Sequence, residues 1–180
     1  MATASPSELL ARALAAPATL GEGRLICVDG LAGSGKTTLA RSLAALAPEA
    51  VVLGTDEMLE GWRGLPGLGR SIEDLLRPLA AGRPGTWRRW DWYADGWAET
   101  VTVEPAPLLV LEGVGSAAAS YDELVTLLVW MEADRDVRLE RGLARDGAEH
   151  REHWLTWFDD EAALHAREDT LARADVVLRT

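Results

Sequence analysis

Short apolar runs recur along the chain and predict buried strands. Their positions are 25–28, 51–53, 108–111, 127–131 and 176–178. Between most of these runs, apolar residues recur at helical spacing. The helices that this spacing predicts cover 37–47, 72–81, 135–145 and about 149–173. Because strand and helix patterns alternate, we expect an α/β fold with a doubly wound parallel sheet and helices on both of its faces.

Two further stretches lie outside this alternation. Near the start, Ser5, Pro6 and Glu8 supply an N-cap, a first-turn proline and a capping-box glutamate, which predict a short amphipathic helix. Residues 61–85 are rich in Gly, Pro and Arg, and we expect loops around a short helix there. A length of 180 residues fits one domain, with residues 1–20 as an N-terminal helical extension.

Residues 30–37 read G-L-A-G-S-G-K-T and fit the spacing G-x-x-x-x-G-K-[ST] between a predicted strand and a predicted helix. Such glycines let the backbone turn tightly and direct N–H groups at phosphate oxygens, beside the positive end of the helix. Lys36, the only lysine in the chain, would place a compact charge on the β- and γ-phosphates, and the Thr37 hydroxyl can ligate Mg²⁺. The motif predicts a nucleoside triphosphate site. Its expected ligand-binding residues are Gly30, Gly33, Ser34, Gly35, Lys36, Thr37 and Thr38.

Composition narrows the range of partners. The formal net charge of −11 argues against duplex nucleic acid and anionic membranes. No apolar run reaches transmembrane length, and the N-terminus lacks the basic leader of a signal peptide. The chain contains no Asn or Gln, so a guanine-binding N-K-x-D motif is excluded. Its single cysteine, Cys27, excludes an internal disulfide and is expected to be buried. We expect a soluble, cytoplasmic protein, monomeric or homodimeric.

Parallel sheets bind ligands at the carboxyl ends of their strands. After the second run, Asp56 could orient or deprotonate an acceptor hydroxyl, or Thr55 and Asp56 could cap the next turn; the spacing leaves both open. After the third run, Glu112 could hold Mg²⁺ or position the substrate, or it could be a solvated strand end. The nearby triphosphate motif favours a functional role for Glu112.

Three arginines, Arg138, Arg141 and Arg145, share one face of a predicted helix. They could clamp a phosphoryl group in transit. For the helix taken alone, the favoured alternative is a solvated surface with pairs such as Asp134–Arg138.

Residues 86–97 hold four of the eight tryptophans. This segment could form a pocket for a flat base or a sugar, or it could be an aromatic strip along the sheet edge; we slightly favour the pocket. Its polar residues are Arg88, Arg89, Asp91, Tyr93 and Asp95. His150, His153 and His165 lack metal-ligand spacing and are expected to be surface or packing residues.

Taken in order, these blocks resemble the uridine kinase-like, nucleoside/nucleotide kinase family of small P-loop kinases, in its compact actinobacterial form. The resembling blocks are 28–40 (phosphate loop), 55–58 (acidic), 88–92 (substrate side), 110–116 (E-G) and 138–146 (lid). The first block is highly specific, whereas the others carry weight as an ordered set. The resemblance covers nearly the whole chain.

This resemblance implies a single P-loop kinase domain, 1–180, with strand order 2-3-1-4-5 and a short helical lid at 134–150. It implies transfer of the γ-phosphoryl group of Mg-ATP to a hydroxyl of a nucleoside-like small molecule. The implied catalytic residues are Lys36, Asp56, Arg141 and Arg145. The implied substrate-binding residues are Asp56, Arg89, Asp91, Tyr93 and Glu112, and the implied magnesium ligands are Thr37, Asp56 and Glu112.

The chain also departs from the family pattern. Met58 and Leu59 stand where an aromatic residue usually follows the acidic block, and residues 90–93 read W-D-W-Y rather than F-D-H-P. The hairpin that closes many uridine kinases over the base is not expected in so short a chain. Uridine as acceptor therefore does not follow. A sugar, an antibiotic or another metabolite alcohol is an alternative acceptor, and an ATP-binding regulatory module without turnover is an alternative function.

Overall fold

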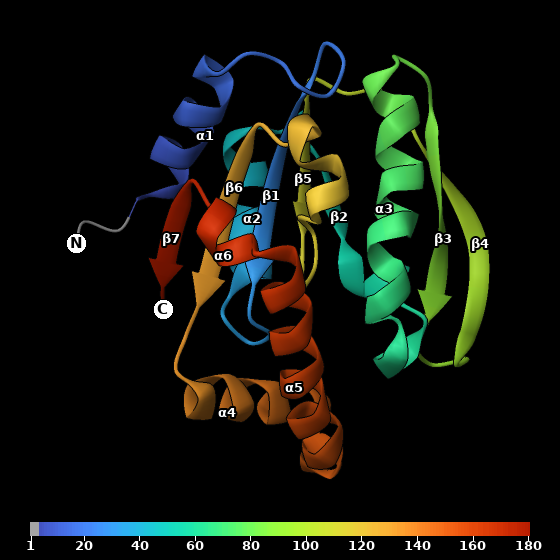
Figure 1. Cartoon of the computed structure of the whole chain (residues 1–180), viewed down its shortest axis with the longest axis vertical. Coiled ribbons are helices and arrows are strands. Elements are labelled where there is room, and N and C mark those ends of the chain that lie inside the picture. The colour runs from blue at the N-terminus through green and yellow to red at the C-terminus, as the bar shows by residue number, and fades with distance from the viewer. Residues whose placement is uncertain (1–3) are drawn as a thin grey trace.

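The computed structural model describes residues 4–180, so the first three residues of the predicted extension 1–20 lie outside it. At its centre is a parallel sheet of five strands in the order β2-β5-β1-β6-β7 (Figure 1). The strands are β1 (Arg24–Gly30), β2 (Val51–Gly54), β5 (Leu108–Glu112), β6 (Leu127–Glu132) and β7 (Val176–Arg179). Counted among themselves along the chain, these strands lie in the order 2-3-1-4-5, which confirms the predicted fold class and strand order.

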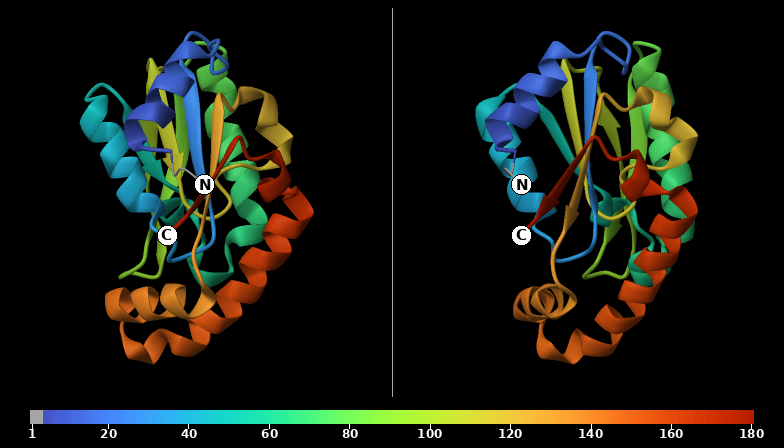
Figure 2. Two further views of the ribbon diagram at one scale, coloured as in Figure 1. Left: turned by 90° about the vertical axis from the view of Figure 1, so that its left-hand side faces the viewer. Right: turned by 60° about the vertical axis from the view of Figure 1, so that its left-hand side comes forward.

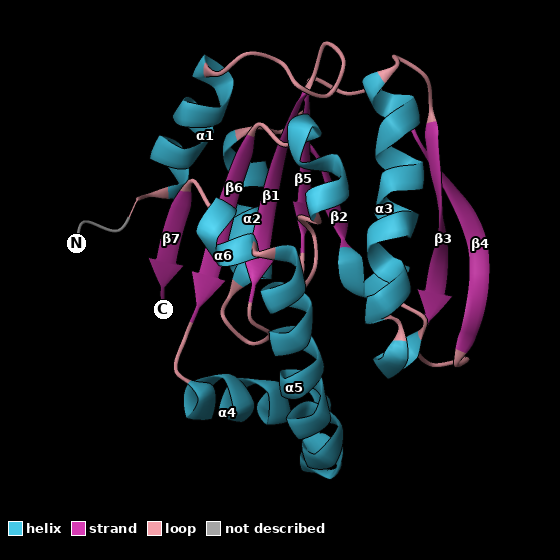
Figure 3. Ribbon diagram, in the orientation of Figure 1, coloured by secondary structure: helices cyan, strands magenta, loops and turns pink. Residues whose placement is uncertain are grey.

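Helices cover both faces of this sheet, as predicted (Figure 2 and Figure 3). One face carries α1 (Pro6–Ala15) and α2 (Lys36–Leu46), and the other carries α3 (Leu65–Ala80), α5 (Arg151–Glu168) and α6 (Thr170–Arg173). The remaining helix, α4 (Arg135–Asp146), lies beyond the carboxyl ends of the strands, at the foot of Figure 1.

Alternate residues of each central strand face the two helical layers. In β1, Ile26 and Val28 pack in the core beneath α1 and α2, whereas Leu25 and Cys27 pack in the core beneath α3 and α5. Burial on both faces explains why these strands are continuous apolar runs rather than alternating ones. Cys27 is buried, as predicted, and its thiol donates to the carbonyl oxygen of Ser116 at 3.2 Å.

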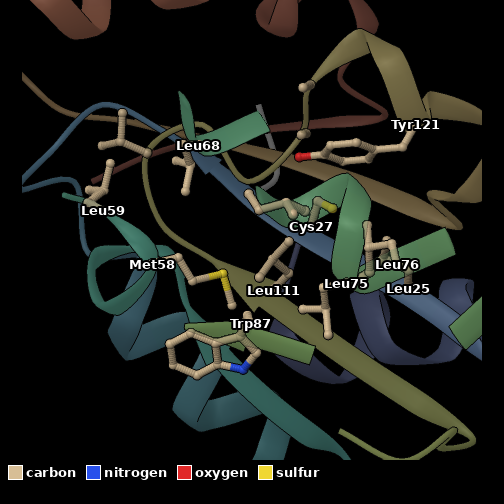
Figure 4. Packing of buried hydrophobic residues seen from close by; sticks show 14 of the residues in the cluster. Leu25, Cys27, Met58, Leu59, Leu68, Leu75, Leu76, Trp87, Leu111 and Tyr121 are labelled. Atoms are coloured by element: carbon tan, nitrogen blue, oxygen red, sulfur yellow. The ribbon is translucent and has the colours of Figure 1, made fainter. Parts of the chain in front are cut away.

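The helix predicted at 72–81 is confirmed, but it begins at Leu65, in the part of residues 61–85 where loops were expected. Helix α3 runs for 16 residues, and its buried face consists of Leu65, Leu68, Ile72, Leu75, Leu76 and Leu79. Figure 4 shows Leu75 and Leu76 beside Leu111 of the sheet. Pro66 lies in the first turn, where the missing N–H is not needed. Burial of the leucine face outweighs the cost of about 1 kcal/mol for each glycine in the helix.

The tryptophan-rich segment forms an antiparallel hairpin, so the expectation of a chain without one is wrong. Strand β3 (Gly85–Asp91) pairs with β4 (Gly96–Val103) to form a separate sheet beside α3 (Figure 1). Trp87 and Trp90 are buried, whereas Arg88 between them is exposed. A shift in register between Arg88 and Trp90 interrupts the period of two that would identify a strand.

The helix predicted over about 149–173 is not continuous. A short 3₁₀ helix, η4 (Ala148–His150), precedes α5, and Asp169, in the left-handed conformation with a φ of 51°, separates α5 from α6. The predicted lid region 134–150 therefore contains α4 and η4. No helix within the described part of the chain is long and apolar enough to cross a membrane.

Candidate active site

The loop of residues 30–37 connects β1 to α2, as the motif requires. Gly30, Gly33 and Gly35 have φ values of 122°, 77° and 92°, in the region that favours glycine. A Cβ at Gly30 would also lie 2.1 Å from the carbonyl oxygen of Met131. Among the described residues, the N–H groups of Gly33 and Gly35 have no hydrogen-bond acceptor. This backbone can therefore offer N–H groups to phosphate oxygens.

Lys36 begins α2 with a buried ammonium group. Its Nζ donates to the carbonyl oxygens of Gly30 (3.0 Å) and Leu31 (2.8 Å). Burial lowers the pKa of Lys36, and nearby carboxylates oppose that shift. The buried hydroxyl of Ser34 has no hydrogen-bond partner in the part of the chain that the structure describes. A buried ammonium and an unpartnered hydroxyl in one loop fit the binding of a polyanion such as a triphosphate.

Asp29 holds this loop to the loop that follows β5, a role that the sequence analysis missed. It is fully buried, and its Oδ1 accepts from the N–H groups of Gly30 (2.6 Å) and Gly115 (2.9 Å), while its Oδ2 accepts from that of Ala117 (2.9 Å). His165 Nε2 lies 3.9 Å from Oδ1, and burial lowers the pKa of His165. A charged residue inside an otherwise apolar strand was the available signal for Asp29.

Asp56 and Glu112 lie close together at the carboxyl edge of the sheet. Gly54 and Glu112 are register partners in β2 and β5. A Cβ at Gly54 would lie 2.5 Å from Asp56 Oδ1 and 3.8 Å from Glu112 Oε1. Asp56 belongs to the 3₁₀ helix η1 (Thr55–Met58), which has no side-chain capping hydrogen bond. The alternative in which Thr55 or Asp56 caps this turn is therefore wrong.

Glu112 is buried beside groups of both charges. Burial raises the pKa of Glu112, the Thr37 hydroxyl and the Lys36 ammonium lower it, and the Asp56 carboxylate raises it. The three residues predicted as magnesium ligands, Thr37, Asp56 and Glu112, thus surround one space and offer only oxygen atoms, which suit Mg²⁺. Within residues 4–180, no three His, Cys, Asp or Glu side chains gather as a metal site. This set fits an ion that takes its remaining ligands from phosphate and water.

The arginines on one face of α4 have different surroundings. Arg138 is buried, and its Nη1 donates to Glu161 Oε1 (2.6 Å) and to the carbonyl oxygen of Ala32 (3.2 Å). The expected surface pair between Asp134 and Arg138 is wrong, because a carboxylate of α5 takes its place. For the same reason, Arg138 is not available for a three-arginine clamp.

The predicted lid arginines, Arg141 and Arg145, are both exposed. Arg141 Nη1 donates to the carbonyl oxygen of Gly33 at 3.2 Å, so this side chain already contacts the phosphate loop. Arg145 makes hydrogen bonds of 2.6 and 2.9 Å to Asp146. These bonds raise the pKa of Arg145, and the carboxylates of Asp56 and Glu112 raise it further. The Arg145 guanidinium therefore lies within electrostatic range of both.

The predicted substrate-side residues make contacts within the hairpin. Arg89 pairs with Glu99 across the two strands at 2.7 Å. Asp91 Oδ1 accepts from the N–H groups of Tyr93 and Ala94, both at 3.0 Å, and so stabilises the turn. Tyr93 is fully exposed. Within residues 4–180, no hydrogen bond or ion pair joins Arg89, Asp91 or Tyr93 to Asp56 or Glu112.

Another hairpin residue, Trp92, reaches the acidic segment. Its Nε1 donates to the carbonyl oxygen of Asp56 at 3.0 Å. The Trp92 ring also lies 5.7 Å from Trp62, which in turn lies 5.3 to 6.3 Å from three further rings. We call this set the aromatic cluster: Trp62, Trp92, His150, His153 and Trp157. It joins the hairpin turn to the start of α5, and it confirms a packing role for the two histidines.

Comparison with solved structures identifies the fold as that of the small P-loop kinases. A candidate uridine kinase from Bacillus stearothermophilus superposes with a TM-score of 0.65 at 21% identity, over 96% of each chain. A candidate fructose transport system kinase from Silicibacter sp. TM1040 superposes with a TM-score of 0.63 at 19% identity, over 97% of this chain and 99% of that one. No protein-family model and no curated protein matches the sequence.

Proposed function

We propose that the protein is an ATP-dependent kinase that transfers the γ-phosphoryl group to a hydroxyl of a small, nucleoside-like molecule. One observation carries this proposal. In a P-loop kinase fold, a phosphate loop with a buried Lys36 lies at the same sheet edge as Asp56 and Glu112. A nucleotide-binding protein without chemistry has no need of an exposed carboxylate at that position.

The phosphate loop supplies the binding energy for the triphosphate. The free N–H groups of Gly33 and Gly35 and the N-terminal end of α2 attract phosphate oxygens. The Lys36 ammonium exchanges its two carbonyl partners for the β- and γ-phosphates. Thr37, Asp56 and Glu112 would hold Mg²⁺, which when bound offsets the charge on the transferring group.

Asp56 accepts the proton of the acceptor hydroxyl as that oxygen forms a bond to the γ-phosphorus. The bond from the γ-phosphorus to the bridging oxygen breaks, and ADP leaves. Positioned base catalysis of this kind contributes about 10²–10⁴ in rate. Arg145 is within range of both carboxylates and can neutralise charge on the phosphoryl group once its bonds to Asp146 are exchanged.

The acceptor binds on the hairpin side of Asp56, where Trp92 and Trp62 offer aromatic faces. Such faces suit a base or a sugar ring. A sugar is the second candidate acceptor, because one of the two similar structures is described in connection with fructose transport. The rival without turnover, a regulatory ATP-binding module, gives no role to Asp56 and Arg145 together.

The experiment is to measure ADP release from Mg-ATP with a panel of nucleosides, sugars and antibiotic alcohols. Wild type, Asp56→Asn and the surface control Asp74→Asn are assayed side by side. We expect one class of acceptor to stimulate release, and Asp56→Asn alone to abolish that stimulation. ATP binding without stimulation by any acceptor would instead favour the regulatory module.

A further inference from the structure

A buried ion pair links the two helices that follow β6. Glu161 of α5 and Arg138 of α4 approach to 2.6 Å, with side chains that are 1% and 7% exposed. Removing two charges from water is costly, and such a pair often adds nothing to stability compared with well-packed apolar residues. Stability alone therefore does not account for this pair.

Both members of the pair also bind the same residue of the phosphate loop. Glu161 Oε2 accepts from the N–H group of Ala32 at 2.7 Å, and Arg138 Nη1 donates to the carbonyl oxygen of Ala32 at 3.2 Å. Ala32 is the third residue of the G-L-A-G-S-G-K-T segment. Since both of its backbone groups are held, the peptide planes on either side of Ala32 have fixed orientations.

The next two residues of the loop are held from the same side. A Cβ at Gly33 would lie 2.7 Å from the carbonyl oxygen of Arg138, so the loop lies directly against α4. The carbonyl oxygen of Gly33 accepts from Arg141 (3.2 Å), and that of Ser34 accepts from Thr180 (3.1 Å). The outer side of the loop is thus occupied by α4, α5 and Thr180, whereas the N–H groups of the two glycines stay available.

The pair also packs against an aromatic ring. The Arg138 guanidinium lies 4.3 Å from the centre of the Phe158 ring, one turn before Glu161 on α5. Burial raises the pKa of Glu161, whereas the Ala32 N–H and the Arg138 guanidinium lower it. The loop and Arg138 therefore stabilise the Glu161 carboxylate together, and the Lys36 ammonium adds to their effect.

We propose that Arg138 and Glu161 are positioning residues of the nucleotide site. They hold Ala32 so that the N–H groups of the loop point at the phosphates, and they couple that orientation to α4 and α5. Neither side chain touches the nucleotide. The proposal rests on the proposed function only in that the ligand of the loop is a nucleoside triphosphate.

The decisive variant replaces both residues, as Arg138→Met with Glu161→Met. Two buried methionines remove the desolvation cost of the ion pair, which offsets the cost of leaving both Ala32 backbone groups unpaired, so thermal stability should change little. Ala32 would nevertheless lose both partners, and the Kd for Mg-ATP should rise by about 10- to 100-fold. The affinities for ADP and for inorganic triphosphate should fall by the same factor, because these ligands bind through the same phosphate loop. A purely structural pair would instead change stability and affinity together.

Single variants test the direction of the effect. Glu161→Gln should weaken Mg-ATP binding. Arg138→Lys should retain much more of the wild-type affinity for Mg-ATP than Arg138→Met does. Ile72→Val, on the buried face of α3, serves as the control that lowers stability without removing a hydrogen bond of the loop. Wild-type affinity for Mg-ATP in the double methionine variant would overturn the proposal.

A second readout needs no nucleotide and separates this proposal from the proposed function. Hydrogen exchange of the Ala32 amide in the free protein should be slow in wild type and in Ile72→Val, and fast in the double methionine variant, which has no acceptor at position 161. Failure of the wild type to bind Mg-ATP would remove the proposed function, while the exchange result would still decide for or against positioning. Equal protection of Ala32 in wild type and the double methionine variant would overturn the positioning role.

Discussion

The phosphate side and the acceptor side of the candidate site are built in different ways. On the phosphate side, backbone groups face the ligand, and buried polar side chains hold the backbone in place. Asp29 accepts a hydrogen bond from Gly30, and the Arg138–Glu161 pair binds both backbone groups of Ala32. On the acceptor side, aromatic side chains from separate segments meet at partly exposed positions around Trp62. The first construction is rigid and general, whereas the second depends on which side chains the surface presents.

This contrast explains why a short motif predicts a triphosphate site but does not predict the acceptor. Tight turns and positive φ angles restrict the residues allowed at Gly30 and Gly33, so the sequence records the shape of the phosphate loop. The acceptor side has no comparable backbone restriction. Trp62 and Trp92 are separated by thirty positions in the sequence, and they meet only because α3 and β3 run in opposite directions between them.

The largest effect should follow from breaking the phosphate side. Lys36→Ala removes the only buried ammonium of the loop, and we expect ATP-dependent turnover to fall by at least about 10²–10³-fold. ADP release under saturating acceptor measures the loss. Arg83→Ala, an exposed substitution after α3, is the matched control. Undiminished turnover in Lys36→Ala would contradict the assignment of the loop.

At the boundary between the two sides, Asp56→Asn should act mainly on chemistry. At saturating Mg²⁺, which compensates for the lost carboxylate ligand, we expect kcat to fall by about 10²–10⁴-fold and KM for ATP to change far less, because the phosphate loop is untouched. Steady-state kinetics in both substrates separate the two constants. An equal rise in KM for ATP would mean that Asp56 holds the nucleotide rather than the acceptor proton.

Glu112→Gln should separate activity from stability. Burial raises the pKa of Glu112 above its ordinary value of 4.5, so the folded state disfavours the carboxylate. This penalty is absent at pH values below 4.5 and complete above the folded pKa, and the contribution of Glu112 to wild-type stability therefore decreases as the pH rises through that interval.

The glutamine variant carries no such penalty. Its Tm should exceed that of wild type above the folded pKa, and the difference should vanish as the pH falls below 4.5. The loss of a carboxylate ligand should meanwhile raise the Mg²⁺ concentration needed for turnover by roughly 10- to 100-fold. Thermal scans across pH and magnesium titrations of activity measure the two effects. A variant that is less stable than wild type at every pH would refute the argument.

The smallest effect should come from the acceptor side. Trp92→Phe keeps an aromatic ring but removes the Nε1–H that binds the carbonyl oxygen of Asp56. We expect KM for the acceptor to rise by about 2- to 10-fold, with KM for ATP unchanged. Trp97→Phe, whose ring packs on Trp90 within the hairpin, is the control. An effect on KM for ATP alone would contradict the placement of Trp92 on the acceptor side.

Local patterns accounted for most of the fold. The five parallel strands, their order and helices α1, α2 and α4 follow from apolar runs, caps and the family resemblance. The hairpin was not predicted because its register shifts between Arg88 and Trp90. The second half of α3 was predicted, whereas its first half was not, because glycines and a proline mask the leucine face there. In both elements, tertiary burial outweighs local propensity.

The candidate site divides in the same way. Asp56 and Glu112 could be predicted to lie together because neighbouring parallel strands end at one edge. The partnership of Arg138 with Glu161 could not, since it depends on the angle between α4 and α5, which no local pattern specifies. The sequence spacing correctly placed Arg138 and Arg141 on one face of the helix. It could not show that only one of them would be buried.

The aromatic cluster also gives the protein a built-in optical probe. Trp62, Trp92 and Trp157 come from three segments that must shift if α5 and the hairpin close around an acceptor. Rings this close together influence one another's near-ultraviolet circular dichroism and emission. Binding of an acceptor should therefore change the circular dichroism and emission of the unlabelled protein. Replacing Trp62 with phenylalanine should remove much of that change. Closure could then be timed in a stopped-flow instrument before the acceptor is identified by chemistry.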